Sequence, residues 1–155
     1  MVGNFTLVDQ HGNAFTQEHL KDQWTFLLLG DTHCNEPCAA ALSALAGLLR
    51  RIGTADVVKS TQVLFVSLDP KRDTPEKLRR YLVAFDARFI GATASREILA
   101  RLVEDLSSPG ASSGEGRKAG NLFLIGPDII VRGEFLPPYD VLRLTERFMK
   151  TRIGR

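Results

Sequence analysis

The chain has 155 residues, of which 44% are hydrophobic and 25% charged, and its formal net charge is +2. This length and composition predict one globular domain over residues 1–155, with enough apolar side chains for a full core. The charges are nearly balanced and no basic block stands out, which argues against nucleic-acid binding. No apolar run approaches the length needed to cross a membrane.

The N-terminal residues predict a β-hairpin followed by a short helical turn. Apolar and polar residues alternate from Phe5, and residues 11–13 supply a Gly and an Asn for the turn of the hairpin. Thr16 is placed as the N-cap of a helical turn over residues 17–20. No signal peptide precedes the hairpin, so we expect either a cytosolic protein or a chain that begins after a targeting segment or anchor.

The stretch 27–38 is the centre of the sequence. It opens with three leucines, breaks at Gly30, and then carries the two cysteines of the protein, Cys34 and Cys38. The short apolar run and the break favour a strand of a covered sheet over a helix. Residues 38–52 predict a helix, so both cysteines are expected where a strand passes into a helix.

This position suits reactive cysteines. The unpaired N–H groups and partial positive charge of a helix N-terminus favour the thiolate, which is the reactive and metal-binding form. A C-x-x-x-C spacing places both sulfurs on one helical face if the first helical turn is formed, and the pair can then close a disulfide or share a soft ion such as Cu(I). The alternative, two free cysteines buried as small hydrophobes, does not explain the position between strand and helix.

The remaining sequence predicts alternating strands and helices. Asp73 or Thr74 is expected to cap a helix that starts at Pro75. The predicted strands lie at 61–68, 88–92, 121–125 and 129–133, and the predicted helices at 75–85, 95–106 and 138–151, with a Gly/Ser-rich loop at 107–117. One face of the last helix is assigned to Val141, Leu142, Thr145, Phe148 and Met149. This order predicts a mixed central sheet with helices on both faces.

Four stretches together resemble the Sco/SenC family, thioredoxin-fold proteins that serve cytochrome c oxidase assembly. Residues 5–12 resemble the opening hairpin of the family, residues 30–38 are similar to its G-Y-T-H-C-P-D-x-C signature, and the longest similarities are residues 66–76 and 85–91. The resemblance implies an α/β, thioredoxin-like fold with an N-terminal β-hairpin extension. It also implies a location in the periplasm or facing it, through an N-terminal membrane anchor that is absent from this chain.

One departure from the family bears on the chemistry. Sco proteins bind copper through the two cysteines and a histidine five residues before the aromatic of an H-x-x-x-x-[YF]-L-[IV]-G-P strand. Here that aromatic is Phe123, the matching position holds Lys118, and no histidine follows His33. A protonated lysine has no lone pair for copper, but a cation beside the cysteines would favour thiol–disulfide exchange. The alternative is that Lys118 points out of the loop.

Three functions follow from these residues. The first is a thiol–disulfide oxidoreductase in which Cys34 attacks a partner disulfide and Cys38 resolves the mixed disulfide, with Lys118 assisting. The resemblance implies a partner such as a cysteine pair on an oxidase subunit or another copper-handling protein.

The second function is a copper chaperone or sensor that uses Cys34, Cys38 and an atypical third ligand, because two thiolates alone can bind Cu(I). The third is a thiol peroxidase, which ranks last because Thr32 stands two residues before Cys34 and such enzymes place a threonine three before. The replacement by Lys118 favours the oxidoreductase narrowly.

Overall fold

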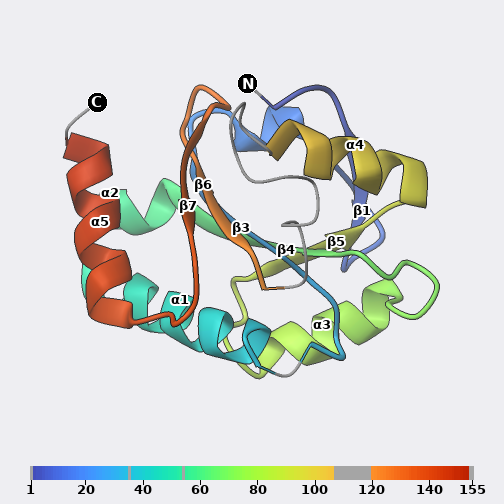
Figure 1. Cartoon of the computed structure of the whole chain (residues 1–155), viewed down its shortest axis with the longest axis horizontal. Helices are drawn as coiled ribbons and strands as arrows, with labels where there is room; N and C mark the ends of the chain where they lie inside the picture. The colour runs from blue at the N-terminus through green and yellow to red at the C-terminus, as the bar shows by residue number, and fades with distance from the viewer. Residues whose placement is uncertain (1, 35, 54, 107–119, 154–155) are drawn as a thin grey trace.

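The computed structural model describes the chain apart from residues 1, 35, 54, 107–119 and 154–155 (Figure 1). Its described strands form one mixed sheet in the order β2-β1-β5-β4-β3-β6-β7. The strands are β1 (Thr6–Asp9), β2 (Ala14–Thr16), β3 (Trp24–Gly30), β4 (Thr61–Ser67), β5 (Ile90–Thr93), β6 (Leu122–Ile125) and β7 (Val131–Phe135). The helices are η1 (Gln17–Leu20), α1 (Cys38–Ile52), α2 (Ala55–Lys59), α3 (Pro75–Val83), α4 (Arg96–Leu106) and α5 (Val141–Ile153).

Strand β3 lies inside the sheet and is buried along its whole length. Phe26 and Leu28 belong to one hydrophobic cluster, whereas Leu27 and Leu29 belong to another. Successive side chains of a strand point to opposite faces, so a strand covered on both sides reads as a continuous apolar run. This confirms the strand predicted before the cysteines.

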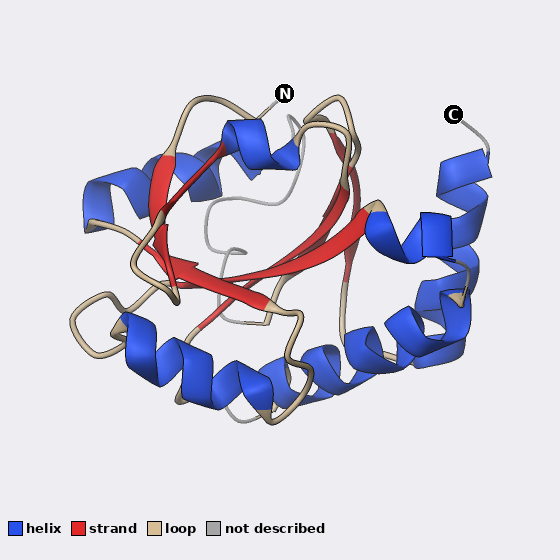
Figure 2. Cartoon of the chain, turned by 180° about the vertical axis from the view of Figure 1, so that it is seen from behind, coloured by secondary structure: helices blue, strands red, loops and turns tan. Residues whose placement is uncertain are grey.

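Helices cover both faces of the sheet, as predicted (Figure 2). The cluster that holds Phe26 includes side chains of α1, α3 and α5, and the cluster that holds Leu27 includes side chains of η1 and α4. The predicted N-terminal hairpin is also present, with β1 antiparallel to β2 and attached to the sheet through β5.

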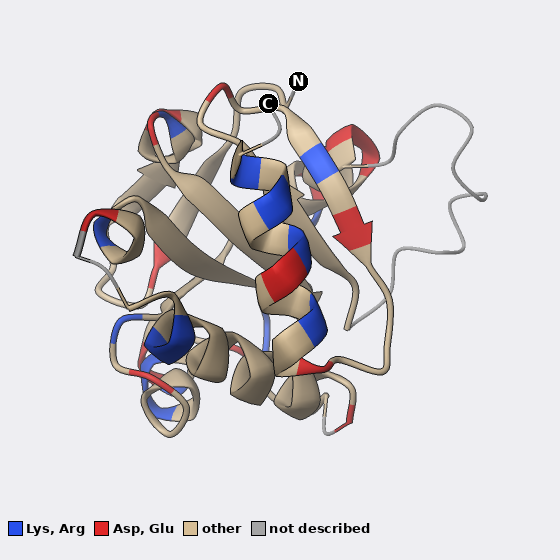
Figure 3. Ribbon diagram, turned by 90° about the vertical axis from the view of Figure 1, so that its left-hand side faces the viewer, with Lys and Arg blue, Asp and Glu red and all other residues tan. Residues whose placement is uncertain are grey.

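The structure corrects three details. The short helix α2 was not predicted. Thr74, not Asp73, caps α3 by accepting the N–H of Lys77. On α5, Leu144 and Phe148 are buried and Leu142 is 54% exposed, because residues four apart share the face on the sheet while a residue two positions earlier points away. Lys and Arg recur along α5, with one acidic residue among them (Figure 3).

The strand order places two loops side by side where β3 and β4 end. β3 and β4 are parallel, and their last residues, Gly30 and Ser67, are register partners. The N–H of Leu68 donates to the Gly30 carbonyl at 2.8 Å. The loop after β3, which carries Cys34, and the loop after β4 therefore leave the sheet side by side, at the end of the strands where α/β proteins place their sites.

Candidate functional site

Cys34 and Cys38 form a disulfide with a Cα–Cα distance of 5.6 Å. Cys38 is the first residue of α1 and is fully buried, whereas Cys34 lies before the helix and is half-buried. The condition for both sulfurs to share one helical face is therefore not met, because the helix starts only at Cys38. The turn between them still brings the sulfurs within bonding distance, and the alternative of two free buried cysteines is excluded.

Gly30 makes room for the buried sulfur. A Cβ at this position would lie 2.6 Å from Cys38 Sγ and 3.0 Å from a ring carbon of Phe65. Both distances are shorter than ordinary van der Waals contact, so no larger residue fits here without displacing the disulfide or the aromatic ring. The break in the apolar run is thus a packing requirement of the cysteine pair.

The loop that carries Cys34 is held by its own first residue. The Asp31 carboxylate accepts the N–H of His33 at 2.8 Å, and the Asp31 carbonyl accepts the N–H of Cys34 at 3.1 Å. Such a turn around an aspartate fixes the backbone over several residues. It sets the direction in which Cys34 enters the disulfide.

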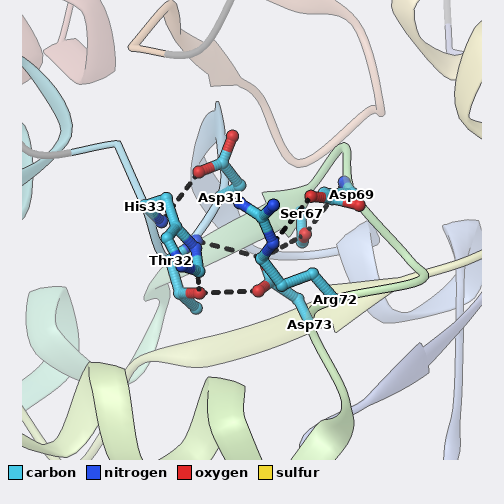
Figure 4. Close-up of polar contacts among 7 residues, drawn as sticks. All are labelled: Asp31, Thr32, His33, Ser67, Asp69, Arg72 and Asp73. Atoms are coloured by element: carbon cyan, nitrogen blue, oxygen red, sulfur yellow. Dashed lines mark hydrogen bonds and ion pairs between the residues drawn. The ribbon is translucent and has the colours of Figure 1, made fainter.

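A buried carboxylate accepts hydrogen bonds from the same loop and from the end of β4 (Figure 4). Asp73, which is 0% exposed, accepts the Thr32 N–H at 3.0 Å, the Thr32 hydroxyl at 2.6 Å and the Ser67 hydroxyl at 2.6 Å. Sequence reasoning considered Asp73 only as a helix cap and missed this role. The signal was present, since hydroxyl residues follow or end two neighbouring strands and the carboxylate comes six residues after Ser67.

A tyrosine lies near the two carboxylates. The hydroxyl of Tyr81 is buried and has no hydrogen-bond partner among the described residues. Burial raises the pKa of Tyr81, and the negative charges of Asp31 and Asp73 raise it further. The phenol therefore stays neutral at physiological pH.

An apolar groove lies beside the cysteine turn. It has a volume of about 420 Å³ and is lined by residues of the turn, α1 and the segment before α5: Glu36, Pro37, Ala40, Pro137, Pro138 and Tyr139. Burial raises the pKa of Tyr139 to about 12, so its hydroxyl remains protonated and donates to the Gly120 carbonyl. The groove therefore joins the turn between the two cysteines to the segment before α5.

Comparison with known proteins identifies the family. The SCO1/SenC family model matches residues 1–146. The chain belongs to the SCO1/SenC family. A Stutzerimonas stutzeri protein named for copper binding is 38% identical over 143 residues, covering 88% of this chain and 70% of that protein. The human SCO1 homologue, a mitochondrial protein, is 30% identical, covering 86% of this chain but 46% of its own length.

Solved Sco structures confirm the predicted fold class. Arabidopsis thaliana ScoI, crystallised with copper bound, superposes with a TM-score of 0.82 and 25% sequence identity over 99% of this chain and 98% of that one. These relatives support copper as a candidate ligand of the Sco site. In the part of this Sco chain that the structure describes, no helix is long and apolar enough to cross a membrane.

The position of the family's third copper ligand is known in this chain from the sequence alone. Lys118, at the position of the family histidine, lies outside the described residues. The chain after it enters the structure beside the cysteines, because the Gly120 N–H donates to the Leu29 carbonyl and Gly120 packs on Pro37. Among the described residues, no three His, Cys, Asp or Glu side chains are grouped as metal ligands.

We predict that Gly30→Ala destabilises the oxidised protein by about 1–3 kcal/mol, because its methyl group overpacks Cys38 and Phe65. Urea unfolding of the oxidised and reduced proteins measures this cost. The cost should fall after reduction, when the Cys38 sulfur is free to move. Gly133→Ala is the matched control for the loss of a strand glycine, since a Cβ there would have its nearest neighbour, the flexible end of Arg147, at 3.7 Å. An equal cost in both redox states would contradict the role of Gly30.

Proposed function

We propose that this Sco protein is a thiol–disulfide oxidoreductase that acts on a cysteine pair during assembly of the cytochrome c oxidase copper site. The observation that carries the proposal is the asymmetry of the disulfide, in which a partly buried Cys34 is bonded to a fully buried Cys38. One sulfur is accessible to a partner while the other is held in reserve, as exchange through a mixed disulfide requires.

In the reduced protein the Cys34 thiolate attacks one sulfur of a partner disulfide. An S–S bond forms between Cys34 and the partner, and the second partner sulfur leaves as a thiolate. Cys38, as thiolate, then attacks Cys34 Sγ, which closes the intramolecular disulfide and releases the first partner sulfur. Two electrons pass to the partner. The described oxidised state is the product, and a dithiol donor returns it to the reduced state.

Two features support this chemistry. The N-terminus of α1 has no acidic residue in its first turn, so its partial positive charge acts on the cysteines unopposed within that turn. Lys118 is proposed as a second cationic aid. The thiol peroxidase alternative loses ground, because the hydroxyl of Thr32 is committed to Asp73.

The partner is proposed to be a protein, and the compartment to be the periplasm or its equivalent. A disulfide persists in oxidising compartments, and the human relative is named as mitochondrial. The groove beside the cysteine turn offers an apolar surface to residues that flank a partner cysteine. An oxidase subunit with a cysteine pair, held near a membrane, fits these requirements.

Trapping tests the order of attack. Cys38→Ser removes the resolving thiol, so incubation with an oxidised peptide containing one C-x-x-x-C disulfide should accumulate a Cys34–peptide adduct, seen by mass spectrometry without reductant. Cys34→Ser is the matched variant and should form its adduct at least about tenfold more slowly, because Cys38 is buried. Equal rates for the two variants would overturn the assignment.

The groove predicts a preference for protein disulfides. Ala40→Glu places a charge in the groove and should slow exchange with a protein disulfide by about tenfold, the equivalent of about 1.4 kcal/mol. Exchange with oxidised dithiothreitol, which is too small to need the groove, should change equally in Ala40→Glu and Ala39→Glu, since it reports only the charge added to the first turn of α1. Ala39→Glu adds the same charge in the same helical turn without lining the groove. A similar loss in both variants would assign the effect to helix charge instead.

A second function is favoured by the copper-bound relative. We infer that reduced Cys34 and Cys38 hold Cu(I) as a substrate, since two thiolates satisfy this soft ion. The oxidised pair has no thiolate to offer, so copper binding and disulfide formation exclude each other. The two functions therefore describe opposite redox states of one site.

Copper affinity decides how the two functions are weighted. We expect the reduced protein to bind Cu(I) weakly in competition with a chelator, and Lys118→His to bind more tightly by about tenfold or more, because it supplies the imidazole ligand. Lys118→Gln controls for loss of the charge alone. Tight binding of one copper by the unaltered protein, with no gain in Lys118→His, would establish the carrier function and an unseen ligand.

A further inference from the structure

Asp73 is a buried ionisable side chain with no cation beside it in the described structure. Its ion pairs would have to come from Lys, Arg or His within 4 Å, and none of the described residues supplies one. Three donors, the N–H and hydroxyl of Thr32 and the hydroxyl of Ser67, replace water instead. A buried charge is costly unless it is hydrogen-bonded. Because the three hydrogen bonds share one carboxylate, the loss of one donor raises the cost of burying that charge and weakens the network.

The donors come from different segments of the chain. Thr32 belongs to the loop after β3 and stands two residues before Cys34, while Ser67 ends β4. Asp73 itself is fixed by its own N–H, which donates to the Asp69 carbonyl at 3.0 Å. The carboxylate thus ties the cysteine loop to the neighbouring strand and to the start of α3 (Figure 4).

The two cysteines are held by separate supports. Cys38 is the first residue of α1 and is fully buried beside Gly30, so the position of its backbone does not depend on the loop. Cys34 packs against the core but lies in the loop, whose described attachments include the Asp31 turn and the contacts of Thr32 with Asp73. The distance between the two sulfurs in the reduced state is therefore governed by what holds the loop.

We propose that Asp73 is the positioning residue of the cysteine pair: through Thr32 it holds Cys34 against Cys38 and so sets the equilibrium between dithiol and disulfide. The proposal rests on the thiol–disulfide function proposed above and adds a residue to it that touches neither sulfur. Holding two thiols in place raises their effective concentration, which favours closing the disulfide over leaving it open.

The test measures that equilibrium directly. The purified chain is equilibrated with mixtures of reduced and oxidised dithiothreitol, in which two electrons pass from the protein dithiol to the cyclic disulfide of the reagent or back. Alkylation and mass spectrometry then give the fraction of the protein that is oxidised. We expect Asp73→Asn to disfavour the disulfide by about tenfold, which corresponds to a reduction potential about 30 mV higher.

Variants of Thr32 separate positioning from folding. Thr32→Val removes the hydroxyl and should shift the equilibrium in the same direction, whereas Thr32→Ser keeps it and should match the unaltered protein. In the double variant Asp73→Asn/Thr32→Val the shifts should be less than additive, because both remove one contact. If Asp73→Asn does not fold, the comparison of Thr32→Val with Thr32→Ser still tests the positioning role.

Asp86→Asn is the matched control. Asp86 follows the other end of α3 and is paired with Arg88 at 2.8 Å, so the variant loses a bound carboxylate remote from the cysteine loop. Its disulfide equilibrium should not change. If Asp73→Asn and Thr32→Val lower the unfolding free energy but leave the equilibrium within about twofold of the unaltered protein, or if Asp86→Asn shifts it equally, the proposal is overturned.

The positioning role and the proposed function can fail separately. A failure to trap a mixed disulfide on Cys34 would remove the oxidoreductase, yet the equilibrium constant with dithiothreitol would still be measurable. Conversely, trapping with an unshifted equilibrium in the Asp73 and Thr32 variants would keep the oxidoreductase and remove the positioning role.

Discussion

The parallel pairing of β3 with β4 is the constraint on which the site depends. It aligns Gly30 with Ser67, so that the loops after the two strands leave the sheet as neighbours. The first loop carries Cys34, and the second carries the carboxylate that accepts the hydroxyl of Thr32. The described residues of the two loops form neither helix nor strand, and the sheet provides the fixed frame against which both are placed.

At the ends of β3 and β4, the same residues serve both the packing of the core and the chemistry of the site. The glycine that ends β3 leaves space for the sulfur of Cys38, and that sulfur is at once part of the hydrophobic core and half of the redox pair. The buried carboxylate of Asp73 likewise serves the fold and the loop together. Substitutions of these residues are therefore expected to change both the dithiol–disulfide equilibrium and the stability of the fold.

Much of the architecture could be predicted because its signals are local. The apolar run of β3, the proline that starts α3 and the Thr16 cap each depend on neighbours in sequence. The sequence predicts Leu142 on the apolar face of α5, but this side chain is exposed. The spacing of apolar residues does not by itself show which face of a helix packs on the sheet. The contact between Asp73 and Thr32 spans 41 residues, and only the register of two strands brings it about.

The burial of Cys38 has a kinetic consequence. When a partner thiolate opens the disulfide at the partly buried Cys34, the displaced sulfur does not diffuse into solvent, because α1 and the end of β3 enclose it. It stays beside the bond that joins the two proteins. In the proposed exchange, Cys38 is therefore already placed to attack the mixed disulfide and release the partner.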